Sequence, residues 1–140
     1  MRWADVIPAA CTALEADTAL MAALGAGALI EATTARRLVR APSVSWFLVA
    51  DPEGELWEPV LVQWDLVTAS WAAMATIEAR VRAVLHHDTP TVLGGVTMWS
   101  QVVDARTVPI ETEKDPNLVH RQLDVRFTAL RSKYVVVATP

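Results

Sequence analysis

The sequence predicts an α+β domain in which a mainly antiparallel β-sheet packs against an N-terminal helix and a central amphipathic helix, in the order α-(α)-β-β-α-β-β. Residues 59–68 and 119–130 each alternate apolar and polar side chains, which is the pattern of a strand with one buried face. Between them, residues 70–86 repeat apolar side chains at three- and four-residue steps, which indicates an amphipathic helix. One domain over residues 1–140 accommodates all three segments.

Two helices are expected at the start of the chain. Residues 3–15 carry an apolar stripe, and because Pro8 is best tolerated in a first turn, the regular helix is expected to begin near Asp5. Asp17 is a typical N-cap for a second, short helix over residues 18–24. The Gly-Ala-Gly sequence that follows is expected to end this helix.

The next segments are expected to form the first part of the sheet. Residues 28–40 fit either an extended segment or a turn. Residues 43–50 alternate but are partly apolar on both faces, which predicts an inner strand. Residues 51–54 (DPEG) have the composition of a turn, so we expect them to join that strand to residues 59–68 in an antiparallel hairpin.

The second half of the chain is expected to supply a helix and two more strands. The stripe of the central helix is predicted to contain Trp71, Met74, either Ile77 or Glu78, Val81, Val84 and Leu85. Adjacent glycines at 94 and 95 predict a tight turn before a strand over residues 96–106. A long polar loop over 107–118 then leads to the strand over 119–130. The apolar tail, residues 134–140, is either a disordered end or docks on a neighbour or on the sheet.

Composition argues against several classes of function. The net charge of −4 opposes sequence-independent DNA binding, which requires a basic surface. No stretch is long and apolar enough to span a membrane as a helix, and the start lacks the features of a signal peptide. Cys11 is the only cysteine, which fits a reducing compartment. Six tryptophans and 53% hydrophobic residues predict that part of the apolar surface lies between subunits.

We expect no catalytic residue, no cofactor and no metal site. His86, His87 and Asp88 are adjacent at a helix end, where the backbone dipole favours imidazolium, and they lack the spacing of metal ligands. Cys11 lies on the apolar stripe of the first helix and is expected to be a core thiol rather than a nucleophile.

Arg36, Arg37 and Arg40 form the one basic cluster in the sequence. Three interpretations of the cluster are open. It could bind phosphate or the carboxylates of a partner. It could also border a solvated strand edge, where basic residues block unwanted pairing, or form a subunit contact together with Glu31.

Scattered residues over positions 3–132 carry a family resemblance. They are LEADTAL at 14–20 before a glycine stop, an apolar strand after Pro42, Trp57, the QWD triplet at 63–65, IEARVRAVL at 77–85 and HRQLDVRF at 120–127. With the order of elements, they resemble the tail-terminator, or tail-completion, family of long-tailed (siphovirus-like) bacteriophages and gene transfer agents. The chain departs from that family at residues 29–32 (LIEA), where family members often carry a Gly-Arg-Ile/Val-Tyr-like strand start.

The resemblance implies a structural virion protein and not an enzyme. Family members form a ring, typically a hexamer, at the head-proximal end of the tail. The ring caps the growing tube of major tail tube protein, stops its polymerisation and joins the tail to the head-completion, or stopper, protein. DNA passes through the lumen without specific binding. The chain is accordingly expected in the virion tail, assembled in the host cytoplasm, with no membrane partner.

The basic cluster, the polar loop and the apolar tail are the expected subunit or partner contacts. Their residues are Arg36, Arg37, Arg40, Glu111, Glu113, Lys114, Asp115, Tyr134 and Val136.

Three other functions stay open. One is a head–tail connector or stopper protein of the same particle. Another is a small hydrolase that uses Asp65, Asp124 or His120, which would require a concave pocket that gathers these residues. The third is a dimeric α+β ligand-binding module.

Overall fold

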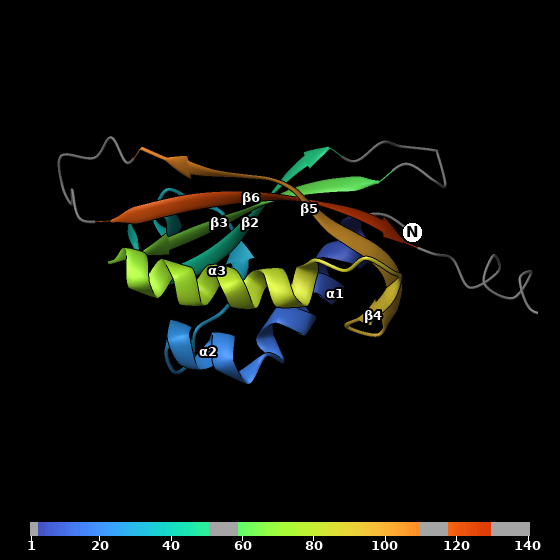
Figure 1. Cartoon of the computed structure of the whole chain (residues 1–140), viewed down its shortest axis with the longest axis horizontal. Helices are drawn as coiled ribbons and strands as arrows, with labels where there is room; N and C mark the ends of the chain where they lie inside the picture. The colour runs from blue at the N-terminus through green and yellow to red at the C-terminus, as the bar shows by residue number, and fades with distance from the viewer. Residues whose placement is uncertain (1–2, 51–58, 110–117, 130–140) are drawn as a thin grey trace, which may run out of the picture.

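In the computed structural model, a six-stranded sheet lies against a layer of helices (Figure 1). The structure describes residues 3–50, 59–109 and 118–129. The elements are α1 (Trp3–Glu15), α2 (Thr18–Leu24), β1 (Glu31–Ala32), the 3-10 helix η1 (Arg37–Val39), β2 (Ser43–Ala50), β3 (Val60–Thr68), α3 (Trp71–Leu85), β4 (Thr91–Leu93), β5 (Val96–Val108) and β6 (Val119–Ala129). The predicted α+β class and mainly antiparallel sheet are confirmed.

The strands lie in the order β1-β2-β3-β6-β5-β4. Every neighbouring pair is antiparallel except β1, which runs parallel to β2. β3 and β6 form the centre of the sheet, with Trp64 opposite Leu123 and Val62 opposite Val125. The predicted antiparallel pairing of β2 with β3 is confirmed. The predicted turn at 51–54 and the tail at 134–140 lie outside the described residues.

The hydrophobic core fills the space between the sheet and the helices. Trp64 and Phe127 are fully buried and meet edge to face, with ring centroids 6.4 Å apart. The helices contribute buried side chains from their apolar stripes: Val6, Ala10 and Leu14 of α1, Leu20 and Leu24 of α2, and Met74, Ile77, Val81 and Leu85 of α3. All three α-helices therefore cover the same face of the sheet (Figure 1).

Side-chain caps fix the starts of α2 and α3. The Asp17 carboxylate accepts a hydrogen bond from the backbone N–H of Leu20 at 2.8 Å, which confirms the predicted N-cap. The same carboxylate pairs with the guanidinium of Arg80 and so ties α2 to α3. Hydrogen bonding to Arg80 is the main reason that the pKa of Asp17 is lowered. α2 ends at Gly25, whose φ of 100° favours glycine.

Several boundaries differ from the prediction. α1 begins at Trp3 and not near Asp5, so the exposed Pro8 lies in its second turn. β4 was not predicted; its three residues pair with the start of β5 across the glycine turn. β5 runs beyond residue 106 to Val108 because its pairing with β6 continues to His120.

Two predictions about burial were wrong in part. β2 is an inner strand only along its first half, because the short β1 pairs only with Ser45 and Trp46. No other strand among the described residues pairs with the outer edge of the second half, where Phe47 is 55% exposed. Trp71 is 60% exposed and does not belong to the buried stripe of α3, because it begins the helix beyond the end of β3.

Residues 28–40 contain both of the structures that the sequence left open. β1 is extended, and η1 is a short helical turn.

Among the described residues, no single helix is long and apolar enough to cross a membrane. The segments Val6–Glu15 and Thr18–Leu24 reach that length and composition only together, with a bend of 82° between them.

Candidate interaction surface

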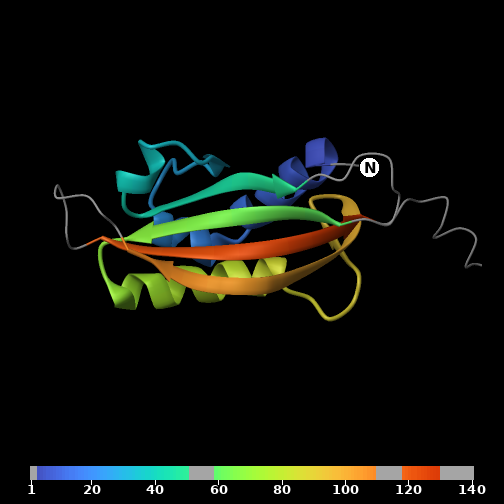
Figure 2. The ribbon, with the colours of Figure 1, turned by 90° about the horizontal axis from the view of Figure 1, so that it is seen from above.

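None of the three α-helices lies on the second face of the sheet (Figures 1 and 2). We call this second face the open face. Strand alternation and register place polar side chains along most of it. Its residues include Ser45 and Phe47 of β2, Gln63 and Asp65 of β3, His120, Gln122, Asp124 and Arg126 of β6, and Trp99, Gln101, Asp104 and Arg106 of β5.

One row of polar residues crosses the open face from strand to strand. Ser45 lies opposite Asp65, Asp65 opposite Gln122, and Gln122 opposite Arg106. Hydrogen bonds follow the row: Gln122 donates to Asp65 at 3.1 Å, and Arg106 Nε donates to Gln122 at 2.8 Å. Directly opposed polar pairs of this kind stabilise the pairing of their strands. These side-chain hydrogen bonds therefore link three of the strands, β3, β6 and β5, which are also paired through the backbone.

Asp65 is the buried centre of this network. Its side chain is 1% exposed, and Oδ1 lies 2.8 Å from Nε2 of His120, which is 7% exposed. The hydroxyl of Thr33 donates to Oδ2 at 2.8 Å, and the amide of Gln63 donates at 3.2 Å to Oδ1. Burial by itself raises the pKa of Asp65, but the hydrogen bonds, led by that from His120, outweigh it and lower the pKa. Asp65 is therefore held as a carboxylate.

Arg106 joins a second carboxylate to the network. Its Nη1 donates to Asp124 at 2.8 Å and to Asp104 at 3.0 Å, while Nη2 donates to Gln63 at 3.0 Å. Hydrogen bonding to Asp124 is the main reason that the pKa of Arg106 is raised. Because Gln63 also donates to Asp65, Asp124 and Asp65 belong to one connected set of hydrogen bonds.

The structure thus brings together the residues that the hydrolase hypothesis named. Asp65 and His120 are in contact, and Asp124 joins them through two intervening side chains. They do not line either of the two cavities described below. Both oxygens of Asp65 accept hydrogen bonds from the protein itself, so the arrangement is that of a buried structural network.

Sequence reasoning placed the strand faces correctly but missed Thr33, Gln122 and Arg106 as members of this network. The sequence does carry polar residues at alternate positions on strands that are otherwise apolar, and this pattern could have indicated the network. Register, which the sequence did not reveal, decides which of these residues are neighbours.

Apolar side chains are exposed on the long outer strands that flank the network. Phe47 and Val49 of β2 are 55% and 47% exposed. Trp99 and Val103 of β5 are 41% and 48% exposed. Val49 and Val103 each lie at a register shift of their strand, where a bulge bends the edge. Exposed aromatic and branched side chains of this kind mark candidate protein contacts.

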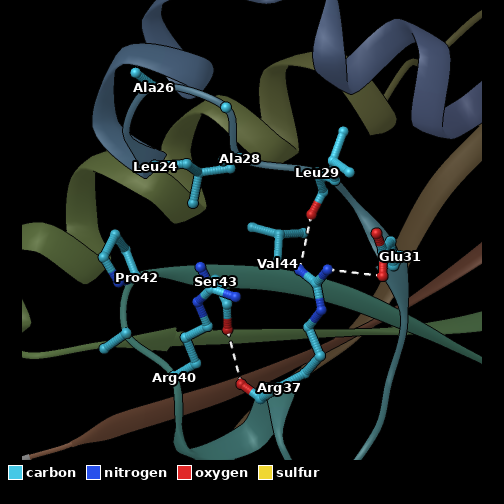
Figure 3. Close-up of a pocket in the computed structure, with 12 residues that line it drawn as sticks. Leu24, Ala26, Ala28, Leu29, Glu31, Arg37, Arg40, Pro42, Ser43 and Val44 are labelled. Carbon is cyan, nitrogen blue, oxygen red and sulfur yellow. Dashed lines mark hydrogen bonds and ion pairs between the residues drawn. The ribbon is translucent and has the colours of Figure 1, made fainter.

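A cavity of about 380 Å³ lies where the end of α2 meets the start of β2. We call it the α2-end cavity. Figure 3 shows Leu24 on one side, with Arg37 and Arg40 on the opposite side. Arg37 pairs with Glu31 at 2.8 Å and donates to the backbone carbonyl of Leu29 at 2.8 Å.

The structure separates the three predicted basic residues by role. Arg37 is only 17% exposed and is held inside its own subunit by Glu31. Arg36 and Arg40 are exposed, and Arg40 lines the α2-end cavity. Arg37 and Glu31, which the third interpretation placed together in a subunit contact, pair with each other within the chain, and the subunit contact itself stays a prediction.

A shallower groove of about 330 Å³ lies along the outer side of α3. We call it the α3 groove. It is lined by Trp71, Met74, Ala75, Glu78, Ala79, Arg82 and Arg121. Glu78 accepts hydrogen bonds from Arg121 at 2.7 Å and from Arg82 at 3.0 Å. The bond from Arg121 is the main reason that the pKa of Glu78 is lowered.

The structure also shows what surrounds the other candidate residues from the sequence, namely His86, His87 and Cys11. Nδ1 of His86 accepts a hydrogen bond from the backbone N–H of Val102, and Nε2 of His87 lies 2.7 Å from the carbonyl of Val84. The described residues contain no group of three or more side chains that could hold a metal ion. Cys11 is half-buried, and burial is the main reason that its pKa is raised to about 12.

Six of the nine predicted contact residues lie outside the described residues. They are Glu111, Glu113, Lys114, Asp115, Tyr134 and Val136. Their roles stay predictions.

Neither a protein-family model nor a curated protein matches the chain. Among solved structures, a chain from the virion of a native gene transfer agent particle has a TM-score of 0.63 and 19% sequence identity. The match covers 87% of this chain and 92% of that chain. The two chains therefore share a fold over most of their lengths. Gene transfer agents are one of the two kinds of particle whose tail-terminator family the sequence resembles.

Proposed function

We propose that this protein is a structural virion protein of a phage-like particle, and within it the tail terminator. In this role it forms a ring that caps the tail tube, stops tube polymerisation and joins the tail to the head-completion proteins. The observation that carries the proposal is the fold shared with a chain of a gene transfer agent virion, over 92% of that chain.

The distribution of exposed residues supports assembly through surfaces. Phe47 on β2 and Trp99 on β5 lie near opposite margins of the open face and are both well exposed. A closed ring uses heterologous contacts, in which one patch of each subunit meets a different patch of the next. Aromatic residues are enriched at such contacts.

The proposed partners follow from this role. They are other copies of the chain in a ring, most simply a hexamer, together with the major tail tube protein and the head-completion protein. The location is the head-proximal end of the tail. The net charge of −4 suits a lumen through which DNA passes without specific binding, because such a surface releases few counterions from DNA.

We assign the Asp65–His120 pair to stability rather than to catalysis. The pair is buried, both oxygens of Asp65 accept hydrogen bonds from protein donors, and neither of the two described cavities is lined by Asp65 or His120. A dimeric ligand-binding module would instead place an apolar cavity between sheet and helices. The two described cavities do border both helices and strands, but neither lining is wholly apolar: Glu31, Arg37 and Arg40 line the first, and Glu78, Arg82 and Arg121 line the second.

A connector or stopper protein of the same particle is the second candidate function. It is supported by the same observation, because the matched chain belongs to a structure of the whole virion particle. The two candidates differ in position and effect. A terminator binds the end of the tail tube and limits its length, whereas a connector binds next to the portal and leaves tube length unchanged.

The test is negative-stain microscopy combined with native mass measurement over a concentration series, with and without the cognate tail tube protein. Tube protein polymerised alone is the control for tube length. Rings, or caps on tubes that become shorter as the protein is added, would support the terminator function. A dimer at every concentration that leaves the tubes unchanged would refute it.

A further inference from the structure

We infer that Trp71 of one copy inserts into the α2-end cavity of the next copy and so forms a subunit contact of the ring. This inference rests on the proposed function. It adds to that function a specific side chain, a specific receptor cavity and the direction in which one subunit follows another.

The α2-end cavity has the chemistry that receives an aromatic side chain. Leu29 and Pro42 in its lining are exposed apolar residues, and Arg40, which also lines the cavity, is exposed (Figure 3). An indole ring placed there gains apolar burial on one side and a cation–π contact with the arginine on the other. The volume of about 380 Å³ is larger than a single tryptophan side chain needs, so the ring enters without displacing the core.

Trp71 is the exposed aromatic side chain that best fits this receptor. At 60% exposure it is more exposed than Phe47 at 55% and Trp99 at 41%. Trp99 is anchored in its own subunit, because its indole N–H donates to the carbonyl of His87 at 3.2 Å. Exposed tryptophans that enter a partner's pocket commonly contribute a large share of the binding energy.

The two surfaces lie at the same end of the sheet. Ser43, which lines the α2-end cavity, pairs with Val67 near the end of β3, and Trp71 begins α3 just beyond that end. A neighbour displaced sideways, across the strands, can therefore bring its Trp71 level with the cavity.

The two surfaces also lie on opposite flanks of the sheet. The cavity is beside β1 and β2, while the α3 groove borders Arg121 of β6, which in turn donates to Thr107 of β5. Figure 2 shows η1 beyond β2 on one flank and the start of α3 beyond β5 on the other. Complementary patches on opposite flanks produce a head-to-tail contact, which closes into a ring when the rotation between copies allows it.

The contact also has a reciprocal side. Leu29 is 57% exposed on the rim of the α2-end cavity. The α3 groove beside Trp71 is lined in part by the apolar side chains of Met74, Ala75 and Ala79. Insertion of Trp71 into a neighbour brings that neighbour's rim against this groove, so apolar surface is buried from both subunits.

The test compares self-association of Trp71→Ala and Arg40→Glu with that of the wild-type protein, by sedimentation velocity and native mass. Trp71→Phe serves as the conservative rescue, and Val92→Ala, which removes an equally exposed apolar side chain from β4, is the matched control. Circular dichroism verifies that each variant folds. We expect both test variants to weaken self-association by at least about tenfold, and the rescue and control to stay close to wild type.

A mixing experiment tests the direction of the contact. Trp71→Ala retains an intact cavity, and Arg40→Glu retains an intact Trp71. In an equal mixture, each pair can form one intact contact but cannot extend it. We therefore expect dimers with one copy of each variant and no rings.

The outcomes separate this inference from the proposed function. Wild-type rings that persist in Trp71→Ala would overturn the inference and leave the ring function standing. A closed dimer that depends on Trp71 would support the contact but overturn the ring. Wild-type protein that stays monomeric at all concentrations, with and without tube protein, would overturn both.

Discussion

The buried carboxylate of Asp65 offers the sharpest test of what holds the open face together. Asp65→Asn keeps the shape of the side chain but removes its charge. Three N–H donors, from His120, Gln63 and Gln122, then face a neutral group. A hydrogen bond to a charged acceptor contributes roughly 1 kcal/mol more than a bond to a neutral one, so we expect a loss of about 3 kcal/mol in the free energy of unfolding at pH 7.

The effect depends on pH with a definite sign. Hydrogen bonding holds the pKa of folded Asp65 below its ordinary value of 3.8. The ionised carboxylate therefore contributes stability above that value, and the contribution is lost as the pH falls through the pKa of the folded state. The difference between wild type and Asp65→Asn should be full at pH 7 and should shrink as the pH falls below about 4, where Asp65 of the unfolded chain begins to take up a proton while folded Asp65 is still ionised.

Urea denaturation of both proteins at a series of pH values between 7 and 3 measures this difference. Asp104→Asn is the matched control, because its carboxylate is 59% exposed although it also contacts Arg106. We expect the control to change stability by less than about 0.5 kcal/mol. Two results would refute the reasoning: an Asp65→Asn variant as stable as the control at pH 7, or a difference that does not decrease in acid.

Three further predictions concern the scaffold. Gly94→Ala places a Cβ 2.7 Å from the Cα of Ala9 at a φ of +55°, so chemical denaturation should show a loss of roughly 2–4 kcal/mol, against about 1 kcal/mol for Gly95→Ala, which faces open space. Ser70→Ala removes the cap of α3, and the same assay should show a loss of about 1 kcal/mol. Because burial raises the pKa of Cys11 to about 12, iodoacetamide at pH 8 should modify it far more slowly in the native protein than in urea; equal rates would contradict this.

The elements of the fold could be predicted from the sequence because each has a clear period. The alternation in β3 and β6 and the three- to four-residue repeat in α3 depend only on which side chains face the core. The short elements β1, η1 and β4 have no such period, since a two- or three-residue segment takes its structure from the neighbour that it pairs with. Trp71 was assigned to the core because the repeat includes it, although the sheet ends before that position.

The interaction surfaces were harder to predict because they depend on distant segments. The α2-end cavity combines residues from the end of α2, from the segment around β1 and from η1 and the start of β2, which no local pattern links. The basic cluster in the sequence did indicate part of this cavity, because Arg37 and Arg40 line it. The structure was needed to show that Arg37 is used within the chain, whereas Arg40 is exposed at the cavity.

The polar network keeps the exposed apolar side chains of the open face apart. Buried polar groups that satisfy one another stabilise a sheet without presenting a continuous apolar patch, and large apolar patches cause association in solution. Here Asp65 and Arg106 occupy the middle of the face, so the exposed Phe47 on one outer strand stays separate from Trp99 on the other. The exposed apolar side chains of the two outer strands are thus two separate groups and not one continuous patch. The same residues that stabilise the sheet thereby restrict where it can be contacted.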